Sequence, residues 1–197
     1  MDERTRTEME RNNKTTMLAH AFTAVVYIVT FLGELIAGNR GIVYTLIVAV
    51  LAAGPVIAEV FYWKRDRESG MIKHLVAIGY AVLYTFVMFT TTNSLLYVYA
   101  IPMVLIISVY NDEIYALKIN IGVVIENVIV AVAGGITGGF GYRDIGSAMI
   151  EIMVVILVAV YSYFTTYTLK KNNAQKMTTI VEAKRDTETA MQGIEEL

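Results

Sequence analysis

Long apolar runs separated by short polar breaks constrain this 197-residue chain more than any other feature. A helix needs about 20 mostly apolar residues to cross the hydrocarbon layer of a bilayer. Six runs qualify, and we expect spans at 17–37, 42–62, 72–91, 95–109, 114–134 and 147–169. The fourth is short and contains Pro102. The pattern predicts an all-α polytopic membrane protein with six transmembrane helices and a C-terminal cytoplasmic helix.

The basic residues test that count, because cytoplasmic loops are enriched in Lys and Arg. With six spans, 14 of the 16 Lys and Arg residues fall on one side of the membrane, and only Arg40 and Arg143 fall on the other. Both termini are therefore expected in the cytoplasm and the chain in the plasma membrane. Five spans would put the termini on opposite sides and would break this segregation.

The sequence predicts three segments: a cytoplasmic N-terminal tail at 1–16, a transmembrane bundle at 17–169 and a cytoplasmic helical linker at 170–197. The linker has no Pro, so we expect the last span to continue into it as one helix. Its positions 177, 184, 191 and 180, 187, 194 follow a seven-residue repeat, weakened by Lys184 and Thr187. This pattern indicates the start of a coiled coil and a homodimer, although a solvated amphipathic tail is the alternative. The repeat is still running at Leu197, as expected of an isolated module or a shortened chain.

A glycine-rich stretch at 134–141 precedes the last span. It lacks the Gly-Lys-Ser/Thr ending of a phosphate-binding loop. We expect a flexible connector there, or else a lid over an outer pocket.

Ionisable side chains within a membrane are costly and by default mark function. Glu34 and Glu151 fall near the outer ends of the first and last spans, and Glu126 falls near the middle of the fifth, beside Asn127. These four are the candidate ligand-binding residues of a small outward-open pocket for a cation, an amine or a proton. The alternative for Glu126 and Asn127 is a structural hydrogen bond between helices.

Glu59 falls near the inner end of the second span, where we expect interfacial water, Lys64 or Arg65 to compensate it. His20 and His74 also fall near the inner surface. Interfacial packing is the expectation for both, with a pH-sensing pair as the alternative.

Several classes of function are excluded or disfavoured. The chain has no Cys and only two His, so it offers no disulfide, no thiolate zinc site and no histidine-rich metal centre. It contains no catalytic motif, so we expect no enzyme activity and no cofactor. Its basic residues are juxtamembrane, which fits contact with the lipid bilayer rather than with nucleic acid.

Four segments carry a resemblance: 89–94 (FTTTNS), 98–103 (VYAIPM), 110–112 (YND) and 122–127 (GVVIEN). In these the chain resembles the membrane half of methyl-accepting chemotaxis proteins from Firmicutes, which have six spans in place of an extracellular sensor domain. The likeness covers nearly all of the chain, but its motifs are hydrophobic and only moderately specific.

The resemblance implies a homodimeric sensory module that detects an unknown small ligand and passes the signal along the last span into a cytoplasmic coiled coil. In the family, that coiled coil controls a histidine kinase through a coupling protein. This sequence lacks the adaptation helices and the signalling hairpin, so those partners are expected only if a further C-terminal part is present. The alternatives are a small ion-coupled transporter, or a sensor module for a histidine kinase or a cyclic-dinucleotide enzyme.

Overall fold

The computed structural model describes residues 3–195, and the side chains of residues 8–192. This part of the chain is helical and contains no strand, which confirms the all-α prediction. The elements are α1 (Glu3–Ile36), α2 (Ile42–Arg65), α3 (Met71–Thr90), the 3₁₀ helix η1 (Leu96–Tyr99), α4 (Ala100–Ser108), α5 (Glu113–Thr137) and α6 (Ile145–Glu195).

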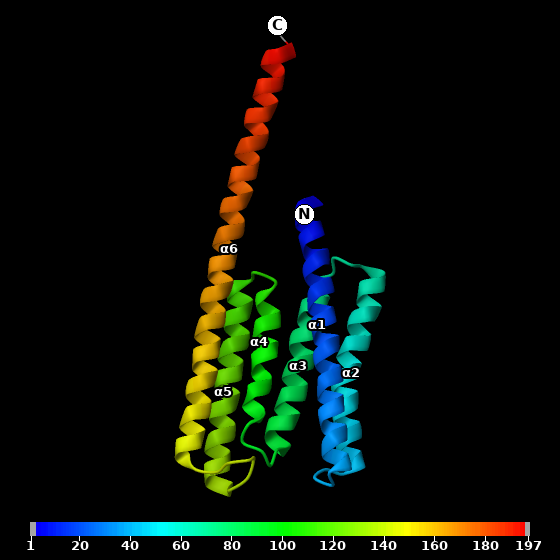
Figure 1. Cartoon of the computed structure of the whole chain (residues 1–197), viewed down its shortest axis with the longest axis vertical. Helices are drawn as coiled ribbons and strands as arrows, with labels where there is room; N and C mark the ends of the chain where they lie inside the picture. Colours follow the sequence, from blue (N-terminus) through cyan, green and yellow to red (C-terminus); the bar gives the residue numbers. More distant parts are fainter. Residues whose placement is uncertain (1–2, 196–197) are drawn as a thin grey trace.

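Successive helices run up and down beside one another (Figure 1). Both termini emerge at one end of the bundle, called here the proximal end, together with the α2–α3 and α4–α5 links. The other three links form the distal end. Among the described residues, α1, α2, α3, α5 and α6 are long and apolar enough to cross a membrane.

The outer surface of the bundle is strongly apolar. Large side chains such as Phe22, Ile36, Val50 and Ile57 are more than two-thirds exposed. A soluble monomer rarely exposes apolar surface on this scale, so the helices fit a protein whose outer face contacts lipid.

The shortest helix, α4, lies at the centre of the bundle. It contacts α1, α3, α5 and α6, and six of its nine residues are buried. Pro102 lies in its first turn, where a missing N–H breaks no helical hydrogen bond. A helix enclosed by protein need not satisfy the length requirement of one that faces lipid. Together η1 and α4 run from Leu96 to Ser108, which matches the predicted segment 95–109 to within a residue at each end. The enclosure explains how so short a helical segment can lie inside the bundle.

The predicted N-terminal tail at 1–16 is not a separate segment in the described residues. Residues from Glu3 onward are the first turns of α1, and Asn13 and Thr16 are fully buried at the proximal end. The Asn13 amide donates to the carbonyls of Arg67 and Ser69 at 2.9 and 3.1 Å, and the Tyr110 hydroxyl donates to Asn13 Oδ1 at 2.9 Å. Asn13 therefore fastens α1 to the α2–α3 link and to the chain after α4.

Two ion pairs also join elements at the proximal end. Lys73 Nζ lies 2.8 Å from Asp112 Oδ2, and Asp112 Oδ1 accepts the Tyr115 N–H that starts α5. Lys170 Nζ lies 2.7 Å from Glu113 Oε1, joining α6 to the beginning of α5. These pairs lie at the level where we predicted the inner membrane boundary.

The glycine-rich stretch, predicted to be a flexible connector or a lid, has two structurally different parts. Residues 134–137 are the last turn of α5, which ends at Gly138 in the left-handed conformation (φ 69°). Gly141 (φ 72°) lies directly on the turn after α3: a Cβ there would be 2.6 Å from the carbonyl carbon of Asn93. Phe140 packs edge-on against Phe89, with ring centroids 5.6 Å apart. The link therefore docks on the distal turn.

Helix α6 continues far beyond the bundle as a single helix of 51 residues (Figure 1). This confirms that the last apolar run continues unbroken into the linker. Every residue from Tyr167 to Gln192 is exposed, a stretch called here the tail. From Tyr167 to Glu195 the helix rises about 40 Å.

Candidate functional site

The most polar cavity described in the structure opens at the distal end. It has a volume of about 520 Å³ and lies between the end of α1, the segment after α3 and the α5–α6 link. We call it the distal cavity; its lining residues are Thr30, Phe31, Glu34, Asn39, Arg40, Thr91, Thr92, Asn93, Leu95, Leu96, Tyr99 and Arg143. One predicted site residue, Glu34, is among them.

Local backbone geometry brings the charges to this cavity. The chain turns sharply after α1 at Gly38 (φ 75°), and the N–H groups of Asn39 and Arg40 donate to the Glu34 carbonyl at 2.9 and 3.3 Å. This turn places Glu34 and Arg40 on the same lining. Arg143 reaches the cavity from the docked α5–α6 link.

The three charged groups of the distal cavity are held apart from one another. Among the described residues, no ion pair within 4 Å links Glu34, Arg40 or Arg143 to an opposite charge. The Arg40 guanidinium lies 4.5 Å from the Tyr44 ring centroid, and its Nη2 lies 3.5 Å from Thr92 Oγ1. Its charge therefore remains available to an anion.

Glu151 lines a second, much smaller cavity of about 20 Å³, beside Tyr142, Ser147 and Arg143. Arg143 thus borders both cavities, whereas Glu34 and Glu151 border one each. Glu126 lines neither of them.

Asn127 acts between helices. It is fully buried on α5, accepts the Tyr84 hydroxyl at 3.0 Å, and donates its amide to the Val123 carbonyl at 2.8 Å. Its neighbour Glu126 is half-buried beside Thr85, and its Oε1 has no hydrogen-bond partner among the described residues. The geometry around Asn127 matches the structural alternative, in which a buried amide joins α5 to α3.

His20 and Glu59 form a buried pair, although we expected both side chains to lie at the membrane interface. His20 Nδ1 is 2.6 Å from Glu59 Oε1, and the two side chains are 2% and 0% exposed. The His20 ring stacks on the Tyr80 ring with centroids 4.4 Å apart. Glu59 is therefore compensated by His20 inside the protein, and the expectation of water, Lys64 or Arg65 is wrong.

The position of Glu59 on α2 explains this correction. It lies on the buried stripe that also contains Thr45, Val48 and Ala52, a spacing of whole helical turns. Pro55 of α2 lies so close to Gly79 of α3 that a Cβ on Gly79 would be 2.5 Å from the Pro55 Cβ. This contact brings α3, and with it Tyr80, against the pair.

One pattern in the sequence could have located His20. On α1 the buried residues Asn13, Thr16, His20, Thr23 and Tyr27 recur every three or four positions, the spacing of one helix face. That face is polar, so it belongs to the protein interior rather than to lipid. Thr16 Oγ1 lies 2.8 Å from the Tyr110 hydroxyl, and the Tyr27 hydroxyl donates to the Tyr99 carbonyl at 3.2 Å.

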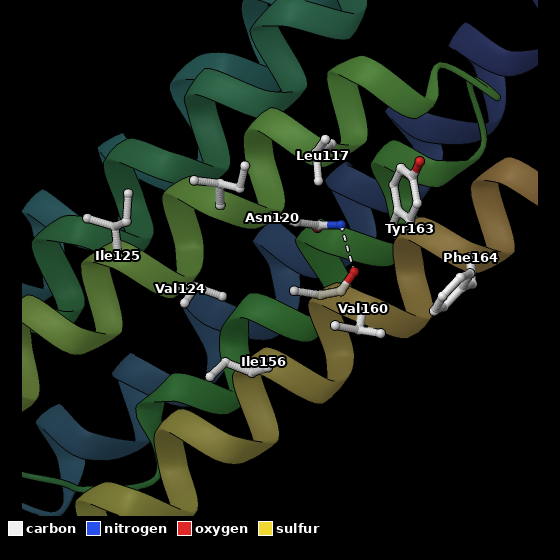
Figure 2. Close-up of a pocket in the computed structure, with 10 residues that line it drawn as sticks. Leu117, Asn120, Val124, Ile125, Ile156, Val160, Tyr163 and Phe164 are labelled. Atoms are coloured by element: carbon white, nitrogen blue, oxygen red, sulfur yellow. Dashed lines mark hydrogen bonds between the residues drawn. The ribbon is translucent and has the colours of Figure 1, made fainter.

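A groove with a volume of about 380 Å³ runs between α5 and α6 on the outside of the bundle. Figure 2 shows Leu117, Val124 and Ile125 on one side and Ile156, Val160 and Phe164 on the other. The Asn120 amide crosses the groove to the Ala159 carbonyl at 3.0 Å, the dashed line in Figure 2. The groove lining is apolar apart from this one bond, as expected of a surface that faces acyl chains.

Among the described residues, no group of three or more His, Cys, Asp or Glu side chains could hold a metal ion. Comparison with models of known protein families gives no match. Comparisons with curated proteins and with solved structures give no significant match either.

Proposed function

We propose that the chain is the transmembrane sensory module of a chemotaxis-type signal transducer, which passes a stimulus from the distal cavity through α6 to the tail. The proposal includes six spans, with the short central α4 as the fourth. The proximal end is then cytoplasmic, because 14 of the 16 basic residues fall at or near it, and Arg40 and Arg143 alone fall at the distal end.

The observation that carries the proposal is the continuity of α6. This helix begins at Ile145, two residues after the cavity-lining Arg143, and continues unbroken through the bundle into the tail. A helix transmits a rotation or a shift along its axis because its hydrogen-bond ladder resists local deformation. Suppose that Arg143 can occupy two positions and that a ligand binds more tightly to the protein in one of them. The ligand would then favour the position of the tail that goes with that state.

The tail is a polar helix with a few exposed apolar side chains, a composition typical of a helix that packs against another helix. An isolated helix is marginal in water, and most of its stability in proteins comes from packing an apolar face. Ile180, Val181 and Met191 are half-exposed or more, although they lie on the predicted repeat or beside it. A second copy of the tail would cover them and would make the linker a coiled coil.

The orientation of this apolar face sets a condition on the dimer. Eighteen residues make about five helical turns, so Ile180 lies on the same face of α6 as Ser162, which is buried against the bundle. A partner tail on that face would stand over the proximal end of the bundle. Pairing of two copies therefore needs α6 to curve gently away from the bundle beyond Lys170, which lengthens its hydrogen bonds slightly without breaking the ladder.

Disulfide crosslinking tests the proposal directly, because the chain has no native Cys. Ile180→Cys is placed on the apolar face, and Thr178→Cys, on nearly the opposite face, is the matched control. We expect rapid crosslinking between copies in membranes at position 180 and little at 178. Equal crosslinking at both positions, or none at 180, would count against a paired tail.

A second function is favoured by one observation, the buried His20–Glu59 pair on the polar face of α1. Buried ionisable pairs in membranes are found in proton relays of transporters. In this alternative the pair would exchange a proton as the chain carries a solute. Proton-coupled solute flux into proteoliposomes, abolished by Glu59→Gln, would support it; absence of flux for any solute tested would leave sensing as the better account.

A further inference from the structure

We propose that the distal cavity binds a small zwitterion, a molecule with an anionic group and an ammonium group a few bonds apart, of which a free α-amino acid is the simplest. This inference names the ligand class of the sensory site. The geometry of the cavity does not depend on the tail, but the role of the cavity in signalling rests on the proposed function.

The distribution of basic residues is the first argument. Charge segregation leaves only two basic residues at the distal end, Arg40 and Arg143. They come from links far apart in the sequence, yet both line the same cavity. Membrane topology disfavours basic residues on this side, so topology does not account for their convergence.

Second, neither guanidinium forms an ion pair within 4 Å in the described part of the chain. Arg40 is held by a ring face and by a neutral hydroxyl, at 4.5 and 3.5 Å, rather than by a carboxylate. Asp144, next to Arg143 in sequence, attracts that guanidinium but forms no ion pair with it within 4 Å. Its Oδ1 and Oδ2 instead accept the N–H and the hydroxyl of Ser147 at 2.9 and 2.8 Å. Planar guanidiniums bind carboxylates in a bidentate manner, with geometric specificity.

The third argument is Glu34, which distinguishes a zwitterion from simpler ligands. A plain anion would meet the two guanidiniums but would leave the Glu34 carboxylate without compensation in the same cavity. A plain amine would meet Glu34 but would be repelled by two positive charges. A molecule with both groups satisfies both kinds of lining residue.

The remaining lining fits a ligand with an apolar portion. Phe31, Leu95 and Leu96 contribute carbon surface, and Tyr99 contributes a half-buried ring. A cavity volume of about 520 Å³ lies within the usual range for small-molecule sites. The hydroxyl of Thr92 supplies an additional hydrogen-bonding group, whereas that of Thr91 is engaged with the backbone of Asn93.

Two sources could supply this chemistry. One is a free amino acid, and the other is the phosphoethanolamine headgroup of a lipid, which also joins an anion to an ammonium group. The experiment therefore uses the whole purified chain in a lipid-free detergent. Binding of each of the twenty common L-amino acids, and separately of sn-glycero-3-phosphoethanolamine, is measured by calorimetry at millimolar concentration.

Matched variants and analogues complete the design. Glu34→Gln, Arg40→Gln and Arg143→Gln each remove one charge of the cavity. Arg67→Gln is the control, because Arg67 is an exposed arginine at the proximal end, 3.2 Å from Glu10, and does not line the cavity. For any amino acid that binds, the corresponding amine and the corresponding acid are tested as single-charge analogues.

We expect at least one amino acid to bind, with each cavity variant weakening it about tenfold or more, Arg67→Gln leaving it unchanged, and both analogues binding much more weakly. Binding of the glycerophosphoethanolamine alone, with the same sensitivity to variants, would keep the zwitterion site and identify a lipid headgroup as its ligand. No binding of either probe, or binding that all three cavity variants leave unchanged, would overturn the inference.

The failures of the two proposals can be distinguished. If an amino acid binds but crosslinking at position 180 does not respond to it, the cavity keeps its ligand and the sensory proposal loses its output. If crosslinking responds to some other stimulus while no zwitterion binds, the sensory proposal stands and the ligand assignment falls.

Discussion

Replacing Gly79 with Ala should destabilise the bundle, because the contact of α3 with α2 depends on the missing Cβ. A Cβ at this position would lie 2.5 Å from Pro55 Cβ and 2.8 Å from Pro55 Cγ. It would also lie 3.1 Å from His20 Cε1. The Pro55 ring cannot rotate away as a flexible side chain would, so α3 itself must move.

The expected magnitude follows from two opposing effects. Overpacking of a well-packed interior typically costs about 1–3 kcal/mol. Ala is favoured over Gly within a helix by about 1 kcal/mol. We therefore expect a net loss of about 0–2 kcal/mol in the free energy of unfolding, and a stability about 1–3 kcal/mol below that of a helix-interior Gly→Ala change without the clash. For a chain of this size, each kcal/mol of lost stability lowers Tm by roughly 2–4 °C.

Gly122→Ala is the matched control, because a Cβ on this α5 residue would meet nothing within 4 Å. Unfolding of both variants and the parent protein is followed by thermal denaturation in the same detergent. Gly122→Ala should leave the stability unchanged or increase it by up to about 1 kcal/mol. If Gly79→Ala proves as stable as the control, the close approach of α2 and α3, and the placement of the His20–Glu59 pair that depends on it, would be refuted.

Three further changes probe the polar contacts. His20→Ala should cost about 1–3 kcal/mol by leaving Glu59 buried without its partner, and the double variant with Glu59→Leu should recover part of this loss in a double-mutant cycle. Although partial burial opposes ionisation, hydrogen bonds from Lys73 and from a backbone N–H hold the pKa of Asp112 below its ordinary value of 3.8. The stability gained from this carboxylate is thus present at neutral pH and lost as the pH falls through the lowered pKa. Asp112→Asn keeps an N-cap residue but loses the charge that faces Lys73, so it should cost up to about 1 kcal/mol at neutral pH. The stabilities of parent and variant should converge in acid. Asn13→Ala removes the hydrogen bonds to the α2–α3 link, so protease cleavage of that link should accelerate severalfold.

The sequence allowed the helices to be predicted because a long apolar run has few other outcomes. Continuity of α6 followed from the absence of Pro and of a turn signal after Tyr167. The bounds of the short fourth segment could be predicted to within a residue, but its place at the centre of the bundle could not, since a short helix can replace a full span only when other helices enclose it. Hydropathy does not record that enclosure, which depends on tertiary packing.

The candidate residues show the same limit. Depth along each span could be predicted for Glu34 and Glu151, but the faces that meet could not, so their separation into two cavities is known only from the fold. Glu59 was assigned to the wrong neighbours because proximity in sequence favoured Lys64 and Arg65. Its partner His20 comes from another helix, and only the polar stripe on α1, which the sequence prediction did not use, could have indicated it.

The central claim is that the distal cavity and the tail are coupled through α6, and it can be tested without a known ligand. The rate of crosslinking at Ile180→Cys is compared in membranes with and without Thr92→Trp, which fills the distal cavity. Ile136→Trp is the control, because Ile136 is distal and 80% exposed but does not line the cavity. We predict that Thr92→Trp changes the crosslinking rate severalfold and that Ile136→Trp does not. Identical rates in all three proteins would contradict transmission from the cavity to the tail.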